Sequence, residues 1–295
     1  MAVDVDLFGD FVDQERARFN MDVSIDQLEV VRRYAWFNLR RLPQRKWKVH
    51  YSKELKQNPF FIKNTQYIEH IRNKAEHGDD LTPHASLRVN NIEGRDELLA
   101  DWGIYHLHLG HGTKPAAAIG FVNRASELLF VFPSNGNLYL LDVLDHKWTS
   151  FHLIQVIDNN WPEVIDQYKL KGNIELAINP TEDELYKLRK NQLNVSFRVG
   201  NSFFIGPGGG LAINGAASRA VNKALDLQRH FDKYSQQFIK EETDLRKILG
   251  EKVGANITVD PLCLKLKRYD PQKATVEILE TNLGIELTFL FPKIV

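Results

Sequence analysis

Apolar residues recur every three or four positions in several stretches of the chain, and this spacing predicts amphipathic helices. The clearest run begins at Ser24-Ile-Asp-Gln27, which has the form of a capping box, and ends before Pro43. We therefore expect a helix of about 18 residues there. Further helices are expected at residues 64–75, 96–100, 150–159, 181 onward and 216–249.

The helix expected at residues 216–249 is the longest of these. Its apolar stripe, which includes Val221, Leu225, Phe231 and Ile248, is somewhat irregular. A helix of this length can brace two parts of the chain or join two copies of it. A homodimer through this helix is therefore one expectation.

Other stretches alternate apolar and polar residues, which is the pattern of a half-buried β-strand. Residues 128–132 and 138–143 are two such strands, and Asn135-Gly136 between them favours a tight hairpin turn. Further strands are expected at residues 46–51, 104–109, 174–178, 193–199, 257–266, 275–279 and 285–291. Together these elements predict an α+β fold with a central mixed sheet, a β-hairpin and flanking helices.

The length of 295 residues is roughly twice that of a common domain, so about two compact units are expected. Changes in pattern near residues 90 and 200 divide the chain into three segments. Residues 1–90 form a helical region that is first acidic and then basic. Residues 91–200 form the central α+β domain, and residues 201–295 hold a glycine-rich loop, the long helix and closing strands.

Composition narrows the class of protein. Apolar residues make up 43% of the chain and charged residues 26%, which is ordinary for a globular protein. No apolar run has the length of a membrane helix, and the N-terminus is acidic, so we expect no membrane association and no export. The single cysteine, Cys263, fits a reducing compartment, and a cytoplasmic location is expected.

The net charge of the whole chain is zero, so any electrostatic attraction to nucleic acid must come from a local group of basic residues. Residues 1–29 hold eight acids against two arginines, a net charge of −6. Residues 32–56 hold nine basic residues against one glutamate, a net charge of +8. Aromatic residues interleave with the basic ones, a composition that suits phosphate contacts and base stacking. The candidate nucleic-acid-binding residues are Arg33, Trp36, Arg40, Arg41, Lys46 and Lys48. The alternative is that the aromatic residues belong to the core and that the basic face is solvated or neutralised by the acidic segment.

The strand expected at residues 104–109 contains the strongest candidate site. His106 and His108 are two positions apart, so both rings leave the same face of the sheet. One imidazole could then act as general base and the other as general acid on a phosphodiester. Arg124 could stabilise the charge of the transition state, and His146 is a candidate helper.

Two alternatives for the histidines stay open. The pair could clamp a metal ion, although no recognisable set of ligands completes such a site, or it could be a hydrogen-bonded structural pair. The glycine-rich loop at Gly206-Pro-Gly-Gly-Gly210 could present backbone N–H groups to a phosphate, but a tight turn that needs glycine conformations is the favoured interpretation.

These observations predict a metal-independent endoribonuclease without a cofactor, a toxin or phage-defence effector that acts on RNA or other nucleic acid and has an inhibitory or partner protein. A metal-dependent hydrolase or oxygenase on the same histidines is one alternative. A non-catalytic module that binds nucleic acid or protein is the other. The order of helices, histidine strand and hairpin is similar to that of small bacterial ribonuclease toxins, but no motif diagnostic of a family accompanies it.

Overall fold

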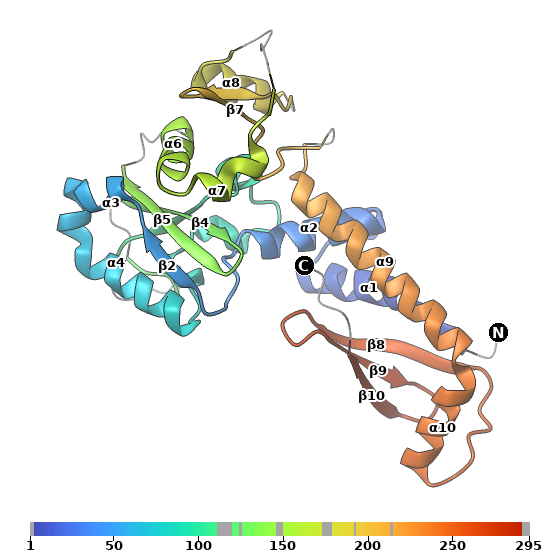
Figure 1. Cartoon of the computed structure of the whole chain (residues 1–295). Helices are drawn as coiled ribbons and strands as arrows, with labels where there is room; N and C mark the ends of the chain where they lie inside the picture. The colour runs from blue at the N-terminus through green and yellow to red at the C-terminus, as the bar shows by residue number, and fades with distance from the viewer. Residues whose placement is uncertain are drawn as a thin grey trace. The chain divides into compact units, whose positions relative to one another are not determined.

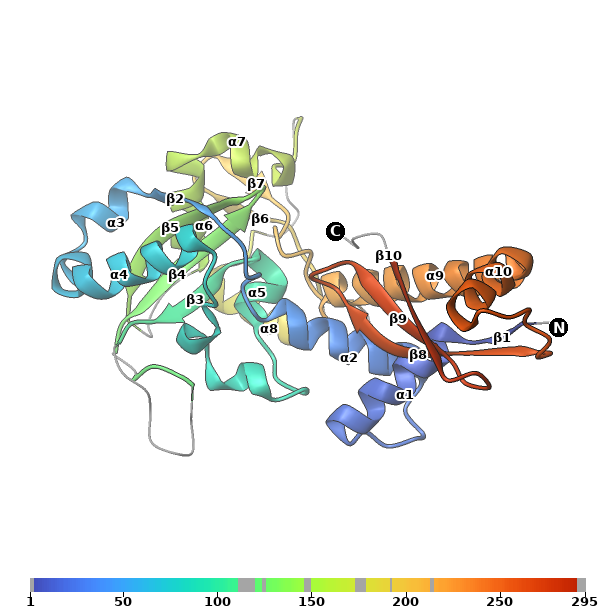
Figure 2. The ribbon, with the colours of Figure 1, turned by 90° about the horizontal axis from the view of Figure 1, so that it is seen from below.

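The chain is a mixed α+β protein, as the sequence predicts. The computed structural model describes residues 3–110, 120–123, 126–145, 150–172, 179–191, 193–212 and 215–290. Contacts group the chain into two compact units, shown in Figures 1 and 2. Unit 1 combines Met1–Ala35 with Val221–Val295, and unit 2 is Trp36–Ala220. These limits differ from the sequence-based boundaries near residues 90 and 200, because the N-terminal segment packs with the C-terminal third of the chain.

Unit 1 is built on a four-stranded sheet in the order β1-β8-β9-β10. Strand β1 pairs in parallel with β8, and the other neighbours are antiparallel. Leu262, Leu264 and Leu266 of β8 alternate with more exposed residues, so only one face of the sheet is buried. The strands are β1 (Val3–Val5), β8 (Leu262–Asp270), β9 (Thr275–Glu280) and β10 (Ile285–Leu290).

Helices cover the buried face of this sheet, and α1 and α9 can be followed above it in Figure 1. Phe11 of α1 and Phe231 of α9 meet in the core, with ring centroids 5.0 Å apart. The helices are α1 (Leu7–Phe19), α2 (Gln27–Leu39), α9 (Ser218–Lys240) and α10 (Glu242–Val253), of which α2 and α9 continue into unit 2. Strand β1 and helix α1 were not predicted from the sequence.

Two helix predictions for this part of the chain were wrong in detail. The helix expected at residues 216–249 is two helices, because α9 ends at Lys240 and α10 begins at Glu242. Helix α2 is shorter than expected, and its first turn is capped by Asp26 instead of Ser24. The Asp26 carboxylate accepts hydrogen bonds from the backbone N–H groups of Leu28 and Glu29, at 2.8 and 3.3 Å.

Unit 2 contains a four-stranded mixed sheet in the order β2-β5-β4-β3. Its strands are β2 (Lys48–Tyr51), β3 (Tyr105–His108), β4 (Leu128–Ser134) and β5 (Asn137–Leu144). The predicted hairpin is confirmed: β4 and β5 are antiparallel, and Asn135 and Gly136 between them have φ values of 47° and 81°. Two successive positive φ angles define the turn type that suits the twist of paired strands.

Helices lie on both faces of this sheet (Figures 1 and 2). Helix α4 packs against β2 and β5 on one face, and α6 packs against β5 on the other. The expected helices at residues 64–75, 96–100, 150–159 and 181 onward are confirmed. The helices of unit 2 are α3 (Lys53–Gln57), α4 (Pro59–His77), α5 (Glu97–Trp102), α6 (Ser150–Asn160), α7 (Pro162–Ile165) and α8 (Glu182–Lys190).

Shorter elements complete the unit. The strand expected at residues 193–199 is reduced to β6 (Phe197–Val199), which pairs with β7 (Ser202–Phe204). Short 3-10 helices lie at Thr82–His84, Leu87–Asn90 and Asp166–Tyr168. The strand expected at residues 174–178 lies outside the described residues. Within the described part of the chain, no helix is long and apolar enough to cross a membrane.

Candidate functional site

His106 and His108 lie on β3, which is an edge strand because it pairs only with β4. The strand alternates, so Tyr105 and Leu107 are buried against the opposite face. The two imidazole rings are 6.0 Å apart between centroids and nearly perpendicular, at 80°. His106 is half-buried and His108 is only 5% exposed.

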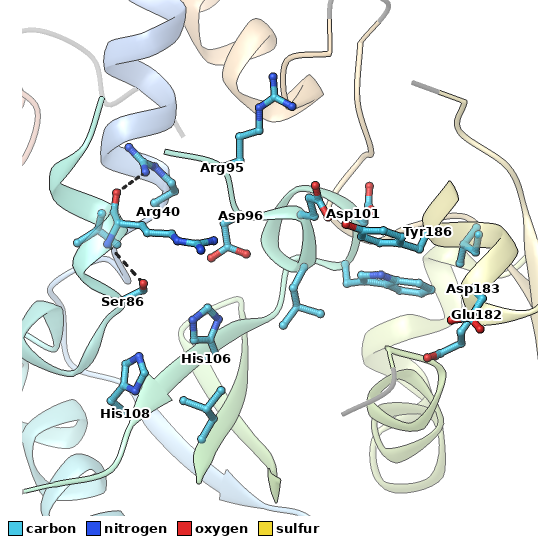
Figure 3. A pocket seen from close by; sticks show the side chains of 17 residues that line it. Arg40, Ser86, Arg95, Asp96, Asp101, His106, His108, Glu182, Asp183 and Tyr186 are labelled. Atoms are coloured by element: carbon cyan, nitrogen blue, oxygen red, sulfur yellow. Dashed lines mark hydrogen bonds between the residues drawn. The ribbon is translucent and has the colours of Figure 1, made fainter. Parts of the chain in front are cut away.

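Both histidines line one cavity of about 720 Å³, shown in Figure 3. Its wall comes from four separate parts of unit 2: the end of α2, residues 86–102, the sheet and α8. The volume falls in the range of about 300–1,000 Å³ that is typical of pockets for small ligands. Charged groups dominate the lining, with three arginines and five carboxylates beside the two histidines.

The arginines of the cavity differ in what they bind. Arg40 is buried and donates hydrogen bonds to the carbonyl oxygens of Arg88, at 2.7 Å, and of Asn91. Burial, helped by nearby Arg41, lowers the pKa of Arg40 to about 10. Arg88 and Arg95 are exposed, and neither makes an ion pair with another described residue. Arg40 therefore fixes the cavity wall, while Arg88 and Arg95 are available to an anion.

The carboxylates lie mainly at the other end of the cavity. In Figure 3, Asp101, Glu182 and Asp183 are on the side opposite Arg40 and His108. Asp101 is 4% exposed, whereas Asp183 is on the exposed side of α8. The cavity therefore has one end that holds the histidines, with Arg40 and Asp96 near them, and an acidic end (Figure 3).

Helix α5 carries several of these residues and is fixed at both ends. Asp96 caps its first turn by accepting a hydrogen bond from Leu99 N at 3.0 Å, and Gly103 ends it with φ +67°. The glycine-rich loop then supports its last turn, because Gly208 N donates to Asp101 O at 2.9 Å and Gly210 N to Ala100 O at 3.0 Å. These two N–H groups bind the protein itself, which favours the structural interpretation of the loop over a phosphate cradle.

His84, which was not among the predicted site residues, supports the other side of the site. It is 1% exposed, and its Nδ1 lies 3.0 Å from the carbonyl oxygen of His108. Because a carbonyl only accepts, Nδ1 carries a proton and donates this hydrogen bond. His84 thereby anchors the end of β3. A lone histidine beside Pro83 carries no sequence pattern that would have revealed this contact.

Arg124 and His146 lie outside the described residues, so their roles stay predictions. Asp142 of β5 accepts hydrogen bonds from His152 Nε2 at 2.8 Å and from Asn58 Nδ2 at 2.6 Å. The hydrogen bond to Asp142 raises the pKa of His152.

The candidate nucleic-acid-binding residues in α2 and directly after it make contacts within the fold. Arg33 pairs with Glu29 at 2.7 Å within unit 1. Trp36 is 8% exposed, and its indole N–H donates to a backbone oxygen at 2.9 Å. The Arg41 guanidinium lies 3.9 Å from the centroid of the Phe37 ring and donates to the Phe37 carbonyl oxygen at 2.6 Å. The buried indole of Trp36 is not accessible for stacking on a base.

Lys46 and Lys48 differ from these residues because they are exposed at the start of the edge strand β2. Neither side chain makes an ion pair with another described residue. A role in binding nucleic acid stays a prediction for both.

No group of three or more His, Cys, Asp or Glu side chains among the described residues is arranged to hold a metal ion. Comparisons of the chain with protein-family models, curated proteins and solved structures return no match. The site must therefore be interpreted from its own chemistry.

Proposed function

We propose that the chain is an endoribonuclease that cleaves RNA without a metal ion, at the cavity formed around His106 and His108. One observation carries the proposal: two imidazoles with ring centroids 6.0 Å apart line the same cavity as two arginines without ion-pair partners among the described residues. Such a set can supply a base, an acid and cations for a phosphate.

The proposed reaction uses the RNA itself as the source of the nucleophile. One imidazole removes the proton of a 2′-hydroxyl, and the oxygen attacks the adjacent phosphorus. The bond from phosphorus to the 5′-oxygen breaks, and the second imidazole, which starts protonated, donates its proton to this leaving oxygen. The products are a 2′,3′-cyclic phosphate and a 5′-hydroxyl. Because the nucleophile is internal, the step needs no metal-activated water.

Arginine side chains would bind the scissile phosphate and stabilise the charge of the phosphorane. The sequence suggested Arg124 for this role. Arg88 and Arg95, which line the described cavity, are further candidates for binding this phosphate. The two exposed lysines, Lys46 and Lys48, are candidates for holding more distant phosphates of the strand.

We place this activity in the cytoplasm, where RNA is abundant. Uncontrolled RNA cleavage there would stop growth, so we further propose a toxin or phage-defence role and an inhibitory partner protein. A homodimer through α9 belongs to the same proposal. Each part can be tested separately from the chemistry.

The test is incubation of the full chain with 5′-labelled single-stranded RNA, with and without EDTA. We expect cleavage in both conditions. His106→Ala and His108→Ala should each lower the rate by about 100-fold or more, the usual contribution of a general acid or base. His77→Ala, which changes an exposed histidine at the end of α4 outside the cavity, should keep full activity.

Equal RNA loss with the wild type and a His106→Ala, His108→Ala double variant would refute the proposal. Loss of activity in EDTA, with recovery on adding zinc or iron, would favour a metal-dependent hydrolase on the same histidines. RNA binding that weakens with salt and survives the double substitution, without any turnover, would favour a non-catalytic binding module.

A further inference from the structure

We infer that the acidic end of the cavity binds the base of the nucleotide whose 2′-hydroxyl reacts, and that it selects guanine. This inference rests on the proposed function, since it assigns the substrate preference of the same site. It starts from the charge of the lining, which contains five carboxylates and three arginines. A site that bound only phosphate groups would have the opposite balance.

The two ends of the cavity suit different parts of one nucleotide. In the proposed reaction the histidines act on the phosphodiester, so the phosphate and the reacting oxygens belong at the end of the cavity that holds His106 and His108, and Arg88 and Arg95 line the same cavity (Figure 3). Asp101 and Asp183 contribute oxygens that only accept hydrogen bonds when ionised. A ligand group at that end must therefore present N–H donors.

An aromatic surface lies beside these carboxylates. Tyr186 lines the cavity and is 57% exposed, so its ring is accessible for stacking. Trp102 lines the same end but is only 2% exposed, and its ring packs edge-on against Phe197 with the centroids 4.4 Å apart. Tyr186 therefore supplies the ring that a base can stack on. An aromatic ring next to hydrogen-bond acceptors is the arrangement by which proteins bind an unpaired base.

Among the four bases, guanine fits an acidic site best. Its Watson–Crick edge places the N1–H and the exocyclic amino group side by side, and one carboxylate can accept both hydrogen bonds. Adenine and cytosine offer a single amino group next to an acceptor nitrogen. Uracil offers one N–H between two carbonyl oxygens, which a carboxylate repels. A bidentate contact discriminates between bases by about 5- to 150-fold.

The first experiment measures binding of nucleoside 3′-monophosphates to the full chain by calorimetry. We expect guanosine 3′-monophosphate to bind at least about tenfold more tightly than the uridine compound. The inosine compound, which keeps N1–H and lacks the amino group, should bind with intermediate affinity. All three ligands carry the same phosphate, so the ratio of affinities isolates the base.

Substitutions locate the contact. Asp183→Asn and Asp101→Asn should each reduce the ratio of guanosine to uridine affinity, and Asp183 is the safer position because it is exposed. Glu163→Gln, on α7 and outside the cavity, is the matched control and should leave the ratio unchanged. Equal affinity for guanosine and uridine compounds, or a ratio unaffected by both aspartate variants, would overturn the inference.

The second experiment separates this inference from the proposed reaction. Cleavage of GpU, IpU, ApU, CpU and UpU is compared for the wild type, with GpU expected to react fastest. Cleavage at equal rates would refute the guanine preference and leave the nuclease proposal intact. Selective, aspartate-dependent binding of the guanosine compound without cleavage of any substrate would support the base site and refute the nuclease.

Discussion

Gly208 offers the most direct test of how the fold builds the cavity. A side chain at this position would overlap the carbonyl oxygen of Ala100 and would lie 2.6 Å from that of Leu99. Both oxygens belong to the backbone of α5, so neither can rotate away. The substitution Gly208→Ala must therefore push the glycine-rich loop away from the helix that carries Asp101 to the cavity.

The cost can be worked out from the contacts that are lost. Forcing a methyl group into a closely packed position costs about 1–3 kcal/mol. Two hydrogen bonds from the loop, Gly208 N to Asp101 O and Gly210 N to Ala100 O, would lengthen or break. Each contributes about 0.5–1.5 kcal/mol. We therefore expect Gly208→Ala to lower the free energy of unfolding of unit 2 by about 2–6 kcal/mol.

Gly209→Ala is the matched control in the same loop. A Cβ there meets its nearest atoms at 3.7 and 3.8 Å, which is ordinary contact, but its φ of +86° disfavours a side chain. We expect this variant to cost only about 1–2 kcal/mol, the penalty of the left-handed conformation. The difference between the two variants then measures the steric contact with α5.

Urea denaturation followed by tryptophan fluorescence is the appropriate assay. All five tryptophans fall within Trp36–Ala220, so their emission follows unit 2 even if the two units unfold separately. The reasoning is refuted if Gly208→Ala is as stable as the wild type, or if it is no less stable than Gly209→Ala. A loss of RNA cleavage in Gly208→Ala below its unfolding midpoint would link the loop to the site.

Three further predictions concern single contacts. His84→Leu removes the donor to the His108 carbonyl, so it should lower the rate of RNA cleavage and reduce the free energy of unfolding by about 1–3 kcal/mol. His84→Asn, whose Nδ2 can replace Nδ1, should restore most of the cleavage rate and, in urea denaturation, most of the stability. Because the bond to Asp142 raises the pKa of His152 above 6.5, the pair stabilises the fold fully below that pH and loses its effect as pH rises through the raised pKa. Because the His152 side chain is 41% exposed, the pair contributes no more than about 1 kcal/mol. The stability difference between wild type and His152→Gln should therefore shrink from pH 6 to pH 9, and a constant difference would contradict this. Gly136→Ala, at φ +81°, should lower stability by about 1 kcal/mol in the same assay, and an unchanged midpoint would exclude strain at the hairpin turn.

The sequence correctly predicted the elements whose turns or ends depend on a few neighbouring residues. Asn135-Gly136 identified the hairpin because only such residues adopt two positive φ angles easily. Thr181 and Glu184 likewise form the reciprocal bonds of a capping box, since Thr181 N donates to Glu184 Oε2 at 2.9 Å and Glu184 N to Thr181 Oγ1 at 3.3 Å. These contacts are complete within four residues and need no partner elsewhere in the chain.

The same motif failed at residues 24–27 because a neighbouring residue competes for the helix end. Asp26 supplies a carboxylate one residue before α2 and accepts the bonds that Ser24 was expected to accept. Ser24 N donates to Asp22 Oδ1 at 2.8 Å, which holds it in a preceding turn. A capping motif thus predicts that a helix begins nearby, whereas local competition decides which residue caps it.

The long helix shows the limit of periodicity alone. Leu225 and Ile248 belong to the apolar stripe read from the sequence, but they are 37% and 39% exposed. Ala224 of α9 and Leu249 of α10 are buried in their place. Packing on the sheet of unit 1 decides which face is buried, and that sheet is assembled from distant strands.

The cavity could be located only in part from the sequence for the same reason. The alternation of β3 put His106 and His108 on one face, which is a local property. Their neighbours in the cavity come from residue 40, from residues 86–102 and from α8, and these segments meet only through tertiary packing. Carboxylates are common in the first turn of a helix, so those of α8 did not stand out in the sequence as site residues.

The acidic and basic runs near the N-terminus could either bind a partner or form contacts within the protein. In the structure, several of these residues form internal contacts. Asp10 accepts from Leu266 N at 2.9 Å, and Glu29 pairs with Arg32 and Arg33. A guanidinium that already binds a carboxylate or a carbonyl must lose that contact before it binds a phosphate. Arg88 and Arg95 have no ion pair to break among the described residues. Because screening confines the effect of these arginines to about 8–10 Å in physiological salt, we expect a phosphate to bind in the cavity more readily than along α2.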